Sequence, residues 1–360
     1  MTMHPTTCLS AALLALVLPF QLHAQQGRGD ARSGTVQSCA AVTPQTCNMA
    51  RSLGRGINLG NMLDAPREGD WGVKFDPAYI DKMAGTFTTV RLPVRWSNNA
   101  APTADAAINE AFARRVDSIV DALLARGFYV ILDLHHYTQI SSDKLHHNEF
   151  AVDPEVLDVR LVNMWRQLAA RYKDRPPKLI FELLNEPHGR LNGEAWNTLS
   201  VKVLAEVRKT NPTRTVIIGP GEWNSIHELS RLRLPRDRNI IVAIHNYDPF
   251  PFTHQGADFM PQFPQGPTCC SDADRKMIVD ALDKARRWNE SSGYPVHLGE
   301  FGTYEKADIK SREAYARIVR DEAERRGIGW AYWEFASPSF GMYSPKSGDW
   351  VEPIRRALLD

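Results

Sequence analysis

Eight short apolar segments rich in β-branched residues alternate with eight longer segments of helical periodicity, and no linker interrupts the series. The expected strands are residues 53–60, 87–95, 128–135, 178–185, 214–219, 239–247, 295–301 and 328–335. The expected helices are residues 76–85, 108–126, 155–173, 193–210, 222–230, 272–292, 307–326 and 350–359. Eight strand–helix units predict an α/β chain that folds as a single (β/α)8 TIM barrel.

A doubly wound open sheet is the alternative, because it also alternates strands with helices. That fold, when it binds dinucleotides, carries a glycine-rich fingerprint after its first strand. The first expected strand, LGRGINLG, is not followed by such a fingerprint, which favours the barrel.

The N-terminal segment resembles an export signal. Residues 9–20 are apolar but too short to span a bilayer, which takes about 20 residues. A small-residue cleavage site follows at Ala24, although no Lys or Arg precedes the apolar run. We expect a signal peptide at 1–24, an N-terminal extension at 25–50 and the barrel domain at 51–360, in a secreted or periplasmic protein. A frayed apolar segment is the alternative.

After cleavage four cysteines would remain, an even number that suits an oxidising compartment. Cys39 with Cys47 would close a short loop and leave Cys269 and Cys270 as a vicinal pair. Cross-pairing between the two clusters is equally compatible with the count, so the sequence leaves the pairing open.

The charge balance argues against nucleic acid as a partner. Lys and Arg number 43 against 42 Asp and Glu, which gives a formal net charge of +1. No strong positive field is therefore available to attract a phosphate backbone. We expect a monomer with no membrane association once the signal is removed.

Polar side chains close nearly every expected strand. In a (β/α)8 barrel the active site lies at the C-terminal ends of the strands, so these side chains are expected to converge. They are Asn58, Asn61, Arg91, Arg95, His135, His136, Asn185, Glu186, Glu222, Trp223, His245, Tyr247, Glu300 and Trp333.

Two glutamates close different strands. Residues two apart share a face of a strand, so Glu186 is expected on the face of Leu184 and Glu300 on that of Leu298, both inward. Two facing carboxyl groups are what glycosidic cleavage needs, one to donate a proton and one to attack the anomeric carbon. Asp133 and Glu182, deeper in their strands, are expected in buried ion pairs.

The strand-end motifs together resemble glycoside hydrolase family 5, the cellulase and mannanase family of retaining barrels. The matching motifs, in chain order over about residues 53–358, are VRLPVRW, DLHH, LLNEP, HNYDPF, LGEFG and YWEF. Eight matched positions on six strands make this resemblance specific.

The resemblance implies a role for each matched residue. Glu186 would be the general acid/base and Glu300 the nucleophile, with Arg91 and Tyr247 orienting Glu300 and keeping it ionised. His245 would contact the acid/base, and Asn185 would bind the sugar 2-hydroxyl. The same sugar would touch His135 and stack on Trp333. This mechanism requires no metal and no organic cofactor.

Other positions carry weaker indications. His136 and Asn61 resemble sugar-contacting neighbours, and Asp64 lies where some relatives carry a glutamate that touches the glucan. Three loop aromatics are candidates to line a cleft, and loop packing is the alternative for each of them. They are Trp71, Trp223 and Phe340.

A metal site is the least favoured interpretation of the histidines. His146 and His147 could join His135 and His136, but nothing fixes the three convergent ligands that a zinc hydrolase needs. A metal-dependent barrel hydrolase would also usually carry an HxH pair on its first strand, where this chain has GINLGN.

The sequence therefore predicts a retaining endo-β-1,4-glucanase whose partner is a β-glucan chain. A β-mannanase or another β-glycanase of the same family is the nearest alternative, because those specificities share the catalytic set. A non-catalytic glycan-binding protein is the alternative from another class, and it would be indicated by loss of Glu186 or Glu300.

Overall fold

A closed barrel of eight parallel strands lies at the centre of residues 36–360, in a computed structural model that describes residues 1–2 and 36–360. The order β1 to β8 follows the chain, and β1 pairs with both β2 and β8. The open-sheet alternative is therefore wrong. The strands are β1 (Arg55–Asn58), β2 (Thr89–Val94), β3 (Tyr129–Leu134), β4 (Leu179–Glu182), β5 (Val216–Ile218), β6 (Ile240–His245), β7 (Val296–Glu300) and β8 (Gly329–Tyr332).

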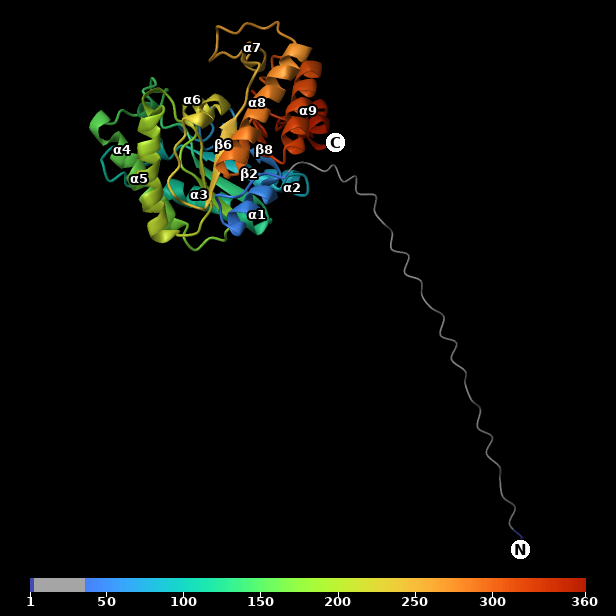
Figure 1. The fold of residues 1–360 in the computed structure, drawn as a ribbon, viewed down its shortest axis with the longest axis horizontal. Coiled ribbons are helices and arrows are strands. Elements are labelled where there is room, and N and C mark those ends of the chain that lie inside the picture. Colours follow the sequence, from blue (N-terminus) through green and yellow to red (C-terminus); the bar gives the residue numbers. More distant parts are fainter. Residues whose placement is uncertain (3–35) are drawn as a thin grey trace. The chain divides into compact units, whose positions relative to one another are not determined.

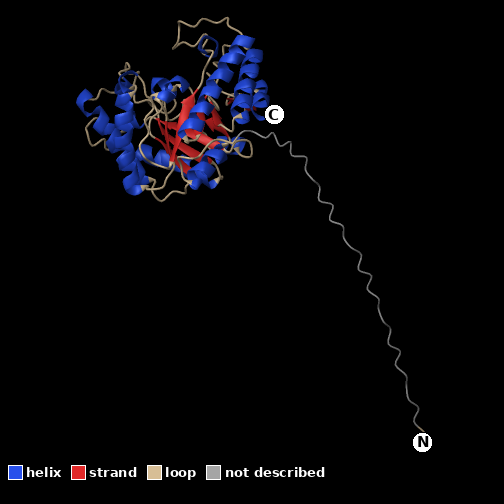
Figure 2. Cartoon of the chain, in the orientation of Figure 1, coloured by secondary structure: helices blue, strands red, loops and turns tan. Residues whose placement is uncertain are grey.

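Helices surround the strands (Figures 1 and 2). The α-helices are α1 (Pro44–Leu53), α2 (Ala78–Met83), α3 (Glu110–Ala125), α4 (Leu157–Arg171), α5 (Glu194–Thr210), α6 (Gly221–Asn224), α7 (Phe250–Thr253), α8 (Asp272–Ser292), α9 (Ile309–Arg325) and α10 (Glu352–Leu359). Short 3₁₀ turns are η1 (Trp96–Asn99), η2 (Thr138–Ser141), η3 (Pro154–Val156), η4 (Gly189–Leu191) and η5 (Ile226–Ser230), and β9 (Tyr343–Ser344) pairs with β10 (Asp349–Trp350).

Local sequence signals set the helix ends. Ser271 and Asp274 form a capping box at the start of α8, and Gly293 ends that helix in the left-handed conformation. Asn109 caps α3 by accepting from the backbone N–H of Phe112. These signals explain why the expected helix 272–292 agrees with the structure at both ends.

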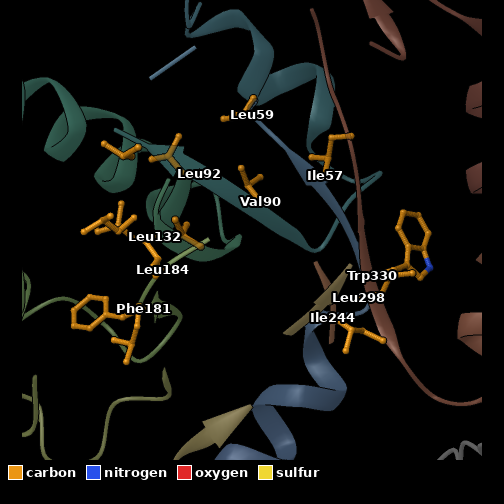
Figure 3. Packing of buried hydrophobic residues seen from close by; sticks show 14 of the residues in the cluster. Ile57, Leu59, Val90, Leu92, Leu132, Phe181, Leu184, Ile244, Leu298 and Trp330 are labelled. Atoms are coloured by element: carbon orange, nitrogen blue, oxygen red, sulfur yellow. The ribbon is translucent and has the colours of Figure 1, made fainter. Parts of the chain in front are cut away.

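The core has two layers. Outward-facing strand residues such as Val90, Leu132 and Leu298 pack with the surrounding helices (Figure 3). Inside the barrel a smaller cluster joins residues of four strands to α1. It comprises Met49, Ala50, Leu53, Ile131, Ile180, Ile217, Ile241 and Ala243.

Two expectations about elements fail. Helix α1 is not among the expected helices; most of it lies in the expected N-terminal extension, 25–50, and its buried residues cover the N-terminal end of the barrel. The expected helix 222–230 is instead the short turn α6 followed by η5, because Glu222, Trp223 and Asn224 all have positive φ angles. A run of left-handed residues cannot continue a right-handed helix.

The cysteines pair locally. Disulfides join Cys39 to Cys47 and Cys269 to Cys270, so the cross-paired alternative is wrong. The expected signal peptide at 1–24 lies outside the described residues, apart from residues 1–2. No helix in the described part of the chain is long and apolar enough to cross a bilayer.

Candidate active site

The residues singled out in the sequence meet at the C-terminal ends of the strands. Arg91 lies within β2, and His245 and Glu300 are the last residues of β6 and β7. The others follow the ends of their strands: Asn61 after β1, His135 and His136 after β3, Asn185 and Glu186 after β4, Trp223 after β5, Tyr247 after β6 and Trp333 after β8. Four of these, Asn61, His136, Glu186 and Trp223, have positive φ angles between 48° and 61°.

Arg91 is the centre of the buried polar network. Its guanidinium is fully buried and bonds Glu182 through Nε at 2.7 Å and Nη2 at 3.1 Å. Asp133 Oδ2 lies 3.0 Å from Nη2, which confirms the buried ion pairs expected for Asp133 and Glu182. Nη1 donates to Asn58 Oδ1 at 3.0 Å and to Glu300 Oε1 at 2.7 Å. One cation thus orients carboxyl groups from three strands.

Glu300 has a hydrogen-bond donor on each oxygen. Arg91 contacts Oε1, and the hydroxyl of Tyr247 donates to Oε2 at 2.9 Å. Burial raises the pKa of Glu300 to about 7, while Arg91 and Tyr247 act in the opposite direction. Donors to both oxygens favour the ionised form.

Glu186 has a different environment. His245 Nδ1 lies 2.8 Å from Glu186 Oε1, and burial raises the pKa of Glu186 to about 7. Burial lowers the pKa of His245 to about 4, so its ring is neutral at neutral pH. Asn224 Nδ2 lies 3.2 Å from His245 Nε2, and because an amide N–H₂ only donates, the ring proton sits on Nδ1. His245 therefore presents an N–H to Glu186.

The two carboxyl groups lie close together. One oxygen of Glu186, one oxygen of Glu300 and one ring nitrogen of His245 lie within 4.8 Å of one another. Retaining glycosidases have carboxyl groups about 5 to 5.5 Å apart, whereas inverting enzymes separate them by about 6.5 to 9.5 Å. The nearest oxygens of the two carboxyl groups are therefore close enough to act on the same bond.

Asn185 and His135 hold each other in place. Asn185 Oδ1 accepts from Arg91 Nη2 at 2.8 Å, and its Nδ2 donates to His135 Nε2 at 3.2 Å. His135 Nδ1 then carries the proton and donates to Asp133 at 2.5 Å. The Trp333 ring lies parallel to His135, with centroids 5.5 Å apart and planes 9° apart. Trp333 therefore presents a flat ring parallel to the imidazole of His135.

A second acidic cluster lies between the ends of β1, β3 and β8. Asn61 donates to Glu334 Oε1 at 2.5 Å, and His136 Nε2 lies 4.0 Å from Asp64 Oδ2. Both acids are fully buried, and Asp64 Oδ2 and Glu334 Oε2 have no hydrogen-bond partner among the described residues. Burial raises the pKa of Asp64 to about 7 and that of Glu334 well above its usual range.

The loop aromatics have unequal surroundings. Trp223 is 51% exposed and stacks on His188, with centroids 4.6 Å apart. His188 in turn contacts the carbonyl of Glu186 at 2.6 Å, so Trp223 borders the carboxyl pair. Trp71 meets His136 edge-on at 5.5 Å, and Phe340 is buried against Tyr247 and Tyr304.

Both glutamates reach the site as expected, but the alternation argument that placed them there is wrong. A Cβ at Gly299 would lie 2.9 Å from His245 Nε2 and 3.9 Å from Arg91 Nε, so Gly299 faces inward and Leu298 outward. Glu300 comes inward after a register shift between β6 and β7. β4 ends at Glu182, and Glu186 leaves the strand conformation with φ 48°. Alternation does not extend beyond the end of a strand.

Sequence reasoning missed several neighbours. Asn224 sets the ring proton of His245, His188 supports Trp223, and Glu334 pairs with Asn61. Glu334 directly follows Trp333 in the motif YWEF, and this adjacency was the one feature of the sequence that could have predicted its place at the site.

Two groups of metal-capable ligands occur among the described residues. They are Glu186, His245 and Glu300, and Asp64, His135 and His136. His146 and His147 belong to neither group, although the ring of His146 lies 6.5 Å from that of His136.

The closed (β/α)8 barrel and the carboxyl pair at its strand ends define the class of barrel glycosidases. Residues 54–339 match the family model for cellulase (glycosyl hydrolase family 5), and the chain belongs to this family.

Relatives and solved structures agree with this assignment. The chain is 36% identical over 288 residues to Endoglucanase H of Acetivibrio thermocellus, covering 79% of this chain and 30% of that protein. A solved hyperthermophilic endo-β-1,4-glucanase in complex with substrate is 39% identical, with a TM-score of 0.81 over 87% of this chain and 98% of that one. Thermotoga maritima Cel5A in complex with mannotriose is also 39% identical, with a TM-score of 0.80 over 86% and 99% of the two chains.

Proposed function

We propose that the protein is a retaining endo-acting glycoside hydrolase that cleaves internal β-1,4-glucosidic bonds of cellulose-type or mixed-linkage β-glucans. The observation that carries this proposal is the pair of carboxyl groups within 4.8 Å that have different hydrogen-bond donors. The relatives described above, named as endoglucanases, support a β-glucan substrate.

In the first step, Glu300 attacks the anomeric carbon while Glu186 donates its proton to the leaving oxygen. The bond to the leaving sugar breaks, and an ester bond forms between the sugar and Glu300. Arg91 and Tyr247 keep Glu300 ionised before attack. The raised pKa of Glu186, at about 7, allows it to hold a proton at neutral pH.

In the second step, Glu186 removes a proton from water, and the hydroxide attacks the glycosyl ester and restores Glu300. Two displacements at one carbon retain its configuration. His245, with its N–H directed at Glu186, stabilises the carboxylate form that Glu186 takes after proton donation.

The remaining residues bind the sugar in this proposal. Asn185 has one N–H left after bonding His135 and would use it on the sugar 2-hydroxyl. His135 contacts the same sugar, and Trp333 stacks against its face. His136, Asn61 and Trp223 contact neighbouring sugars.

Two related proposals concern the whole protein. Residues 1–24 act as an export signal that precedes an extension at 25–50 and the catalytic domain at 51–360, so the enzyme is secreted or periplasmic. We further propose that it acts as a monomer. The N-terminal sequence and the sedimentation behaviour of the mature protein test these points.

Mannan is the second candidate substrate, since the related Thermotoga maritima structure contains mannotriose. The test compares reducing-end release from carboxymethyl-cellulose and galactomannan, with Glu300→Gln as the inactive control. A preference for the glucan that Glu300→Gln abolishes would support the proposal. A preference for mannan would replace the substrate, and activity that persists in Glu300→Gln would overturn the mechanism.

A further inference from the structure

A row of aromatic rings leads from Trp333 to the surface. Trp333, Phe340 and Tyr304 form a hydrophobic cluster separate from the two core layers. The rings of Phe340 and Tyr304 lie 5.4 Å apart, and the ring of Phe259 lies 6.0 Å beyond Tyr304. The row therefore continues outward from the ring that stacks on His135 at the candidate active site.

Exposure rises sharply at the end of this row. Phe340 and Tyr304 are 4% and 8% exposed, whereas Phe259 is 60% exposed. A single exposed apolar residue usually needs no explanation. This one is different because its ring continues an aromatic row that begins at the candidate active site.

The segment that carries Phe259, residues 254–270, connects α7 to α8 and is held by specific contacts. Gln255, near the start of the segment, holds the end of the segment. Its side chain donates to the carbonyl of Pro267 at 2.7 Å and accepts from the N–H of Gly266 at 2.9 Å. Lys306, from the loop after β7, accepts at its carbonyl from Gln265 and donates to Asp258. In Figure 1 the connection between α7 and α8 extends beyond the ends of α8 and α9.

A covalent bond closes the far end of the segment. Cys269 and Cys270 are joined by a disulfide directly before Ser271, the N-cap of α8. The backbone N–H of Cys269 also donates to the hydroxyl of Ser311 in α9 at 3.0 Å, and both cysteines pack against the main core. The disulfide therefore restricts the backbone where the segment joins the rigid barrel.

We propose that residues 254–270 form a disulfide-anchored wall of the substrate cleft, on which Phe259 stacks against sugar residues outside the catalytic site. This inference rests on the proposed function and extends it to longer chains. Continuity with the Trp333 cluster identifies the occupant as the glycan chain. An exposed phenyl face suits the apolar face of a pyranose ring.

The first test measures binding without turnover. In a Glu300→Gln background, calorimetry compares cellohexaose with cellobiose for Phe259→Ala, Phe259→Trp and the control Met277→Ala, which removes an exposed apolar side chain on α8. Phe259→Ala should weaken cellohexaose binding about five- to tenfold, with cellobiose binding changed less than twofold. Phe259→Trp and Met277→Ala should bind like the parent. Equal affinity of Phe259→Ala and the parent for cellohexaose would overturn the proposal.

The second test addresses the disulfide. A Cys269→Ser/Cys270→Ser variant should weaken cellohexaose binding at least threefold, while Cys39→Ser/Cys47→Ser, which removes the other disulfide, should not. An added dithiol should act on the parent in the same way. It reduces the Cys269–Cys270 bond to two thiols, supplying both hydrogens and electrons, and becomes a cyclic disulfide itself. No effect of the Cys269/Cys270 change would overturn the anchoring role.

Coupling between the two features is also measurable. If the disulfide acts by holding Phe259, the Cys269→Ser/Cys270→Ser change should have no further effect in the Phe259→Ala background. Additive losses would contradict the link. These tests measure binding, so their failure can be told apart from failure of the proposed function. If the wild-type protein bound cellohexaose but did not hydrolyse it, the proposed hydrolase function would be refuted and the binding proposal would stand.

Discussion

At the scale of single residues, the network around Arg91 gives the two glutamates unequal environments. Glu300 receives hydrogen bonds from Arg91 and Tyr247, whereas Glu186 faces the neutral ring of His245. Burial raises the pKa of both carboxyl groups, so the donors around each decide which one ionises first.

Tyr247→Phe tests this asymmetry. Loss of a hydrogen bond to a charged oxygen costs about 1.5–3 kcal/mol, which corresponds to a rise of about one to two units in the pKa of Glu300. Because Glu300 must be ionised to attack in the proposed mechanism, the acidic limb of the kcat/KM profile should move to higher pH. The basic limb, which the proposed mechanism assigns to Glu186, should move less, so the profile should become narrower and its maximum lower. Tyr294→Phe, distant from the site, is the control, and an unmoved acidic limb in Tyr247→Phe would contradict the assignment.

Asp64 supports a prediction about stability. Burial raises its pKa from 3.8 to about 7, so between these values the folded state binds a proton that the unfolded chain has released. The contribution of Asp64 to the free energy of unfolding therefore falls as pH rises through this window. Asp64→Asn keeps an acceptor for the N–H of Met62 and removes the charge.

Urea unfolding of Asp64→Asn should show a gain over the wild type of about 2–4 kcal/mol at pH 8 and little gain at pH 4. Asp280→Asn, on an exposed face of α8, should show no such dependence on pH. An equal gain at both pH values would mean that the Asp64 charge is not the cause.

At the scale of elements, hydrophobic patterning located the strands and most of the helices, because both depend on local periodicity. It missed α1, whose apolar residues cover the barrel end rather than lie between strands. It also failed at 222–224, where three consecutive residues have positive φ. The motifs correctly predicted which residues would lie together. The argument from side-chain alternation was wrong, because Glu186 lies beyond the end of its strand and Glu300 follows a register shift.

Leu53→Ala tests the part played by α1. Leu53 is fully buried in the cluster inside the barrel, at the end opposite the candidate site. Its truncation should lower the free energy of unfolding by about 2–5 kcal/mol while leaving kcat/KM unchanged at a temperature where the variant is folded. Arg51→Ala, an exposed change on the same helix, should be nearly neutral. A selective loss of activity in a stable Leu53→Ala variant would show that α1 acts on the site.

At the scale of the whole molecule, the residues that stabilise the barrel and the residues of the candidate site lie in different parts of it. Apolar clusters fill its N-terminal half and the layer beneath the helices, and the buried acidic side chains gather toward the C-terminal ends of the strands. Sequence reasoning reached the fold because eight repeats of one pattern left few alternatives. The cluster of Asp64 and Glu334 and the wall at 254–270 depend on contacts between distant loops, which periodicity does not encode.

The most direct test of the account is to trap the covalent intermediate. The protein is incubated with an activated 2-deoxy-2-fluoro-β-cellobioside, digested and mapped by mass spectrometry, with Glu300→Gln as the control. The account predicts one added fluorocellobiosyl group on the peptide that contains Glu300 and none in the control. A label on Glu186 or on another residue, or full activity with no label, would contradict it.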